Sequence, residues 1–70
     1  MPLMMAPIGE IKTIVELRVK DELGKHLKDM GVIPGEKVKI MEENASGVIL
    51  FVKGVKVAIT KGLAMKIMVV

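Results

Sequence analysis

The side chains that could carry out chemistry are few and scattered along the chain. His26 is the only histidine, and cysteine is absent. Disulfides, thiol catalysis and cysteine-based zinc sites are therefore excluded. A histidine that acts as a base or a metal ligand needs a carboxylate or a second histidine beside it, and no motif around His26 supplies one. We interpret His26 as a residue at the border of a helix.

Acidic residues and methionines are numerous, but neither forms a recognisable site. The eight carboxylates are Glu10, Glu16, Asp21, Glu22, Asp29, Glu36, Glu42 and Glu43. Their spacing matches no EF-hand loop, so we interpret them as solvated charges. Of the seven methionines only Met4 and Met5 are adjacent, which favours core filling and adaptable contacts over Cu(I) binding. Nucleophile and phosphate-loop motifs are absent. We predict that the protein is not an enzyme and uses no metal or cofactor.

The length and hydropathy of the chain limit its class. A chain of 70 residues is enough for one domain, which we place at residues 1–70. Apolar residues make up 51% of it, yet the longest stretches without a charged residue are nine residues long. A membrane-spanning helix needs about 20 mostly apolar residues. The start of the chain also lacks the pattern of a secretory signal. We expect a cytoplasmic protein that does not insert directly into a membrane.

Alternating apolar and polar residues in Glu10–Val19 predict the first strand. The apolar face of this strand would carry Ile11, Val15, Leu17 and Val19. Ile14 is the one apolar residue on the opposite face. We therefore expect a half-buried strand with Ile14 directed away from the core.

The period changes to that of a helix in Lys20–Met30. The apolar stripe consists of Leu23, Leu27 and Met30. Asp21 is a suitable N-cap, and Gly31 is suited to end the helix in the left-handed region. Because Gly24 weakens the first turn, the helix could begin near Lys25.

Four more strands are predicted after the turn at Pro34-Gly35. They are Glu36–Glu42, Gly47–Val52, Val55–Thr60 and Lys66–Val70. Lys53-Gly54 suits a tight hairpin, and Lys61–Met65 suits a single helical turn. The order indicates an all-β fold, a small five-strand barrel with one short α-helix after the first strand.

The third predicted strand is apolar on both faces, although a small barrel has only one inner face. Val48, Leu50 and Val52 would lie on one face, together with the neighbouring Val55, Val57 and Ile59. Phe51 would lie on the other face, beside Lys56. We therefore predict that Phe51 is at least partly exposed, in a patch to which Ile49, Met65, Met68 and Val70 could also contribute. The alternative is that the helix or the N-terminal lead-in covers this face.

Two segments resemble the ferrous iron transport protein A (FeoA) family. Leu27–Gly35 is similar to the family pattern L-x-x-[LM]-G-h-x-P-G, where h is apolar, and Gly54–Val69 is similar to G-x-x-h-A-h-x-x-x-x-A-x-x-h-x-V. The resemblance implies an SH3-like fold and a cytosolic partner, the GTPase part of the ferrous iron transporter FeoB. The loop Glu43–Gly47 departs from the family because it is short and contains no proline.

We therefore expect a small accessory protein that docks on the cytosolic GTPase domain of FeoB and modulates it. The residues that we predict to bind the partner are Met30, Ile33, Pro34, Ile49, Phe51, Met65 and Met68. Exposed apolar residues could also support weak self-association. One alternative is an SH3-like module of iron-dependent regulation.

A second alternative is a nucleic-acid-binding barrel with a basic face. Its lysines would be Lys12, Lys37, Lys39, Lys53 and Lys56. Phe51 is the only aromatic residue and Arg18 the only arginine, and the net charge is only +3. We do not expect nucleic-acid binding, because such proteins commonly use arginine and several aromatic side chains.

Overall fold

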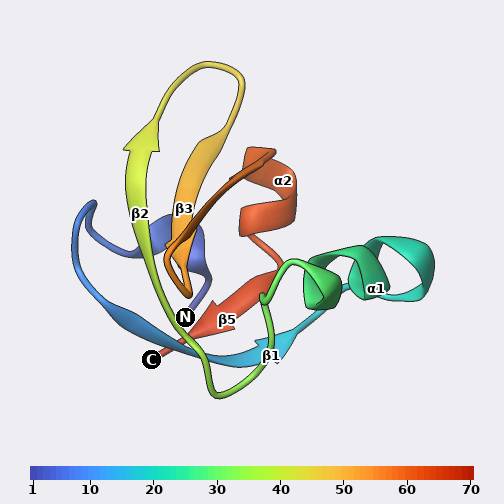
Figure 1. Ribbon diagram of the computed structural model, residues 1–70. Helices are drawn as coiled ribbons and strands as arrows, with labels where there is room; N and C mark the ends of the chain where they lie inside the picture. The colour runs from blue at the N-terminus through green and yellow to red at the C-terminus, as the bar shows by residue number, and fades with distance from the viewer.

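The computed structural model describes all residues of the chain, 1–70. Its elements are a 3-10 turn η1 (Leu3–Met5), β1 (Lys12–Leu17), α1 (Asp21–Asp29), β2 (Lys37–Glu43), β3 (Val48–Val52), β4 (Val55–Ile59), α2 (Lys61–Ala64) and β5 (Ile67–Val69). The five strands form one antiparallel sheet in the order β4-β3-β2-β1-β5. The sheet curls around the core, with α1 at its side (Figure 1). The predicted all-β fold with five strands and a short helix after the first is confirmed.

The β3–β4 hairpin is set by its two-residue turn. Lys53 and Gly54 both have positive φ angles, 50° and 77°, as in the hairpin turns whose twist matches that of the strands. This turn fixes the register, with Val52 opposite Val55. The face of β3 that we expected inside is buried, since Val48, Leu50 and Val52 are at most 2% exposed. Val55 is 54% exposed, contrary to expectation, because it follows the turn at the tip of the hairpin.

The predicted inner face of β1 is wrong. Ile14 is fully buried, whereas Ile11 and Val15 are 62% and 48% exposed. Ile11 precedes the strand, and the pairing of β1 with β5 shifts register between Ile14 and Glu16. A bulge adds a residue to one strand and thereby breaks strict alternation. Ile14 can therefore enter the core while Leu17, three positions later, also packs against it.

Helix α1 begins at Asp21, within the predicted helical segment Lys20–Met30, so Gly24 does not delay its start to Lys25. Its N-cap is Lys20, not Asp21, and no side chain caps it. Gly24 is buried, and a Cβ added there would lie 2.6 Å from the backbone oxygen of Val19. The glycine thus allows the helix to approach the chain that enters it.

The C-terminal end of α1 follows the prediction closely. Gly31 has a φ of 92°, and its N–H donates to the carbonyl oxygen of Lys28 at 3.0 Å. The N–H of Val32 donates to the carbonyl oxygen of Leu27, also at 3.0 Å. This pair of bonds is the Schellman motif, and the accompanying apolar contact is supplied by Leu27 and Val32, both fully buried.

The N-terminal lead-in, residues 1–8, includes the turn η1, which buries Leu3 in the core. Pro2 pairs with Met68, and the Met1 amino group donates to the Val69 carbonyl oxygen at 2.8 Å. The two ends of the chain therefore lie together (Figure 1). Met68, which we expected on the outside, is only 8% exposed because this lead-in covers it. Neither helix has the length and apolar character needed to cross a membrane.

Candidate functional site

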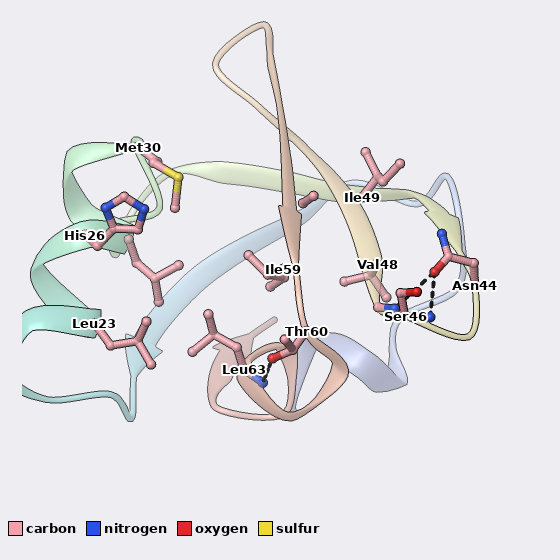
Figure 2. Close-up of a pocket in the computed structure, with 13 residues that line it drawn as sticks. Leu23, His26, Met30, Asn44, Ser46, Val48, Ile49, Ile59, Thr60 and Leu63 are labelled. Carbon is pink, nitrogen blue, oxygen red and sulfur yellow. Dashed lines mark hydrogen bonds between the residues drawn. The ribbon is translucent and has the colours of Figure 1, made fainter.

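An apolar cleft of about 460 Å³ lies between α1, β4 and α2. Eight of its 13 lining residues are hydrophobic. Leu23 and Met30 come from the α1 side, Ile59 from β4 and Leu63 from α2. Figure 2 shows the α1 side chains on one side of the gap and β4 on the other. An apolar cleft of this kind is suited to receive the side chains of a partner.

The two helices place apolar side chains at the cleft for different reasons. On α1, Leu27 enters the core, whereas Leu23, one turn earlier, is 49% exposed at the cleft. On α2, the N-cap Thr60 accepts a hydrogen bond from the backbone N–H of Leu63 at 3.1 Å. The buried Ala64 lets this short helix sit close to the core. Leu63 therefore packs partly against the core and partly lines the cleft.

The β2–β3 loop forms another wall of the cleft. The Asn44 side-chain oxygen accepts hydrogen bonds from the backbone N–H groups of Ser46 and Gly47, at 2.8 and 3.1 Å. Gly47 is buried so close to β4 that an added Cβ would collide with the carbonyl oxygen of Ile59. The asparagine thus organises this short loop without a proline.

A second, smaller hollow of about 190 Å³ lies beside Phe51 on the outer face of the sheet. Phe51 is half-buried, as predicted, and pairs across strands with Lys39 on β2 and Lys56 on β4. The Lys39 ammonium lies 5.5 Å from the centre of the Phe51 ring, within the range of a cation–π contact. Lys53 pairs with Glu36 at 3.2 Å, whereas Lys39 and Lys56 have no ion-pair partner. We call the set Lys39, Phe51 and Lys56 the lysine row.

The structure separates the residues that we predicted to bind a partner. Met30 and Ile49 line the cleft, and Phe51 lines the smaller hollow. Met65 is 46% exposed, Pro34 is exposed and Ile33 is half-buried, but these three line neither concavity, and Met68 is buried. Sequence reasoning missed Leu23 and Leu63 as cleft residues. Leu23 shares the apolar stripe of α1 with Leu27, and periodicity alone does not distinguish its exposed member from its buried one. A four-residue helix is too short for its periodicity to show the position of Leu63.

The cleft contains no arrangement of ionisable groups suited to catalysis. His26 is exposed at its edge, and no charged or polar side chain of the molecule is buried. No three of the histidine and carboxylate side chains lie close enough together to hold a metal ion. What the arrangement can do is contact apolar side chains through the cleft and anionic groups through the lysine row.

A curled five-stranded sheet with one short helix beside it defines a small, mostly β domain of the SH3-like class. The model of the FeoA domain matches residues 1–70 of the chain. The chain therefore belongs to the FeoA family, whose members are accessory proteins of ferrous iron transport.

Individual relatives agree with this assignment. The chain is 37% identical over 68 residues to an Fe(2+) transport protein A of Methanocaldococcus jannaschii, covering 97% of this chain and 83% of the relative. A crystal structure of iron uptake regulatory protein FeoA is 33% identical, with a TM-score of 0.87 over 99% of this chain and 93% of that one. Stenotrophomonas maltophilia FeoA, solved in complex with zinc and described as a procaryotic SH3 domain protein, is 20% identical. Its TM-score of 0.80, covering all of this chain and 89% of the other, establishes the SH3-like fold.

Proposed function

We propose that this protein is a cytoplasmic accessory protein of ferrous iron transport that docks through its apolar cleft on the cytosolic GTPase domain of a FeoB-type transporter. The observation that carries the proposal is the cleft itself, in a member of the FeoA family. Leu23 leaves about half of its surface exposed there, although the same helix has a core position for Leu27. Apolar surface that folding leaves exposed in one concavity favours a partner site.

The names of the relatives support the iron-transport setting. The Methanocaldococcus jannaschii protein is called an Fe(2+) transport protein A. The Stenotrophomonas maltophilia protein is described as a candidate activating factor of bacterial ferrous iron transport. An activating factor can act by binding its target, and the apolar cleft offers a surface for such binding.

Docking would modulate the GTPase by selecting one of its nucleotide-dependent conformations. A binder shifts an equilibrium only by the difference between its affinities for the two states. A tenfold preference for one nucleotide state corresponds to about 1.4 kcal/mol. Burying a few half-exposed apolar side chains in one state and not in the other supplies energy of this order, at about 25 cal/mol per Å².

The proposed contact surface centres on the cleft residues Leu23, Met30, Ile49 and Leu63. The other accessible residues predicted from the sequence, Ile33, Pro34, Phe51 and Met65, stay predictions for contacts outside the cleft. Met68 leaves the set because it is buried.

Calorimetric titration of this protein into a FeoB cytosolic domain tests the proposal directly. The domain is examined without nucleotide, with GDP and with a non-hydrolysable GTP analogue. We expect saturable binding whose affinity differs between these states. Absence of binding in all three would overturn the proposal.

A filter-binding assay with single-stranded and double-stranded DNA and RNA at low salt tests the nucleic-acid alternative, which predicts steep salt dependence.

A further inference from the structure

Strand β4 is an open edge of the sheet. It stands at one end of the strand order and pairs only with β3. The two-residue turn makes Val52 and Val55 a hydrogen-bonded pair, and such pairs alternate along an antiparallel ladder. Val55, Val57 and Ile59 therefore direct their backbone groups to β3. The N–H and C=O groups of Lys56 and Ala58 point the other way, out of the sheet.

This open edge adjoins the apolar cleft. Ala58 and Thr60 line the cleft together with Leu23 and Met30 on its far side. In Figure 2, β4 stands between the α1 side chains on one side and Val48 and Ile49 on the other. Natural proteins usually cover or twist away a sheet edge, because its free backbone groups template pairing with another chain. Here the edge is left with an apolar surface next to it.

The charges beside the edge favour one kind of incoming strand. The lysine row crosses the sheet from β2 through β3 to β4, and it ends at Lys56 on the edge. Neither of its lysines has a carboxylate partner within the protein. A strand added to β4 would place one of its side chains directly beside Lys56, where an opposite charge is stabilising. Its residues on the other face would enter the cleft, where apolar side chains fit.

We propose that β4 is a strand-addition site, and that its occupant is an extended segment of another protein in which acidic and apolar residues alternate. The backbone of the segment would pair with Lys56 and Ala58, its carboxylates would lie beside Lys56 at the end of the lysine row, and its apolar side chains would contact Leu23, Leu63 and Met30. A second copy of this chain fits less well, because its own β4 brings a lysine and no carboxylate. The inference deepens the proposed function by naming how a partner attaches.

The test uses amide hydrogen exchange, followed by NMR, of the whole protein with and without a synthetic peptide, acetyl-Glu-Val-Glu-Ile-Glu-Val-Glu-amide. In the free protein we expect fast exchange at Lys56 and Ala58 and slower exchange at Val57 and Ile59. At saturating peptide, the Lys56 and Ala58 amides should slow by at least about tenfold. Binding without this protection, or no binding at all, would overturn the inference. Protection that grows with protein concentration in the absence of peptide would show a second copy as the occupant and would also overturn it.

Two controls separate backbone pairing from simple attraction between charges. Ala58→Pro removes an outward N–H, which an edge strand tolerates, and should abolish peptide binding. Gly62→Ala, which leaves the β4 edge unchanged and whose added Cβ meets nothing within 4 Å, should change the affinity less than threefold. If Ala58→Pro does not fold, peptides N-methylated at alternate residues replace it. One of the two methylation sets should lose binding and the other should keep it; equal binding of both would contradict strand addition. Because these experiments omit the transporter domain, their failure is distinguishable from failure of the proposed function.

Discussion

Two leucines that lie one turn apart on α1 differ in burial: one is packed in the core and the other is exposed at the cleft. Leu27 is fully buried and belongs to the core, whereas Leu23 is 49% exposed at the cleft. Their side chains have the same size and lie on the same stripe of one helix. Both leucines line the cleft, and the difference comes from their packing: the core cluster encloses Leu27, whereas Leu23 keeps about half of its surface exposed.

The backbone shows the same contrast. At the end of α1 the carbonyl oxygens of Leu27 and Lys28 are satisfied by the N–H groups of Val32 and Gly31. At β4 the outward groups of Lys56 and Ala58 have no neighbouring strand. The C-terminal end of α1 thus has its apolar side chains buried and its carbonyl oxygens hydrogen-bonded. The β4 edge and the cleft beside it instead leave backbone groups and apolar side chains available to a partner. An amphipathic stripe in a sequence indicates burial, but it does not say whether the protein itself or a partner provides it.

Truncation of the buried Leu27 should have the largest effect on stability. Leu27→Ala should lower the free energy of unfolding by about 2–5 kcal/mol, because it leaves a cavity in a fully packed site. Leu23→Ala should cost less than about 1 kcal/mol. Urea denaturation of both variants measures the difference. Equal losses would mean that the two leucines do not differ as described.

Substitutions at Gly24 and Gly62 test whether α1 packs closely against the chain that precedes it. Gly24→Ala should destabilise the protein by about 1–3 kcal/mol, since the new Cβ would lie 2.6 Å from the Val19 backbone oxygen. Gly62→Ala in α2 is the matched control, because nothing lies within 4 Å of its added Cβ. It should stabilise the protein by about 0.5–1 kcal/mol. Thermal unfolding of the two variants should show shifts of opposite sign, and stabilisation by both would refute the close packing of α1.

Phe51 should have a smaller effect on stability, because it lies half-buried on the outer face. Phe51→Ser should lower the free energy of unfolding by about 1 kcal/mol, of which the contact with Lys39 accounts for about 0.5–1 kcal/mol. Weaker binding of an acidic partner should accompany it. A loss of several kcal/mol in urea denaturation, as for a buried phenylalanine, would instead place Phe51 in a second core.

The sequence was most informative where local chemistry decides the structure. The end of α1 at Gly31 and the hairpin turn at Lys53-Gly54 could be predicted. Both require positive φ angles, which few residue types adopt. The inner face of β1 could not, because the bulge after Ile14 arises from pairing with β5, more than fifty residues later. The role of Gly24 could not be predicted either, because it depends on the close approach of α1 to the Val19 backbone and not on helix propensity.

The candidate site was only partly predictable. The two apolar faces of β3 predict an exposed contact surface, and of the residues that we predict to bind a partner, Met30 and Ile49 line the cleft. The cleft itself depends on how far α1 stands from β4, and no periodicity in the sequence encodes that distance. Leu23 therefore looked like a core residue.

Binding of the FeoB cytosolic domain to two matched variants tests the central claim most directly. Leu23→Ser removes an exposed apolar side chain at the cleft, and Ile8→Ser removes one of similar size, 58% exposed, that does not line the cleft. Both variants should keep the stability of the parent protein within about 1 kcal/mol. In calorimetric titrations, Leu23→Ser should raise the Kd at least tenfold, while Ile8→Ser should leave it within twofold. Equal affinities for the two variants would contradict the assignment of the cleft as the docking surface.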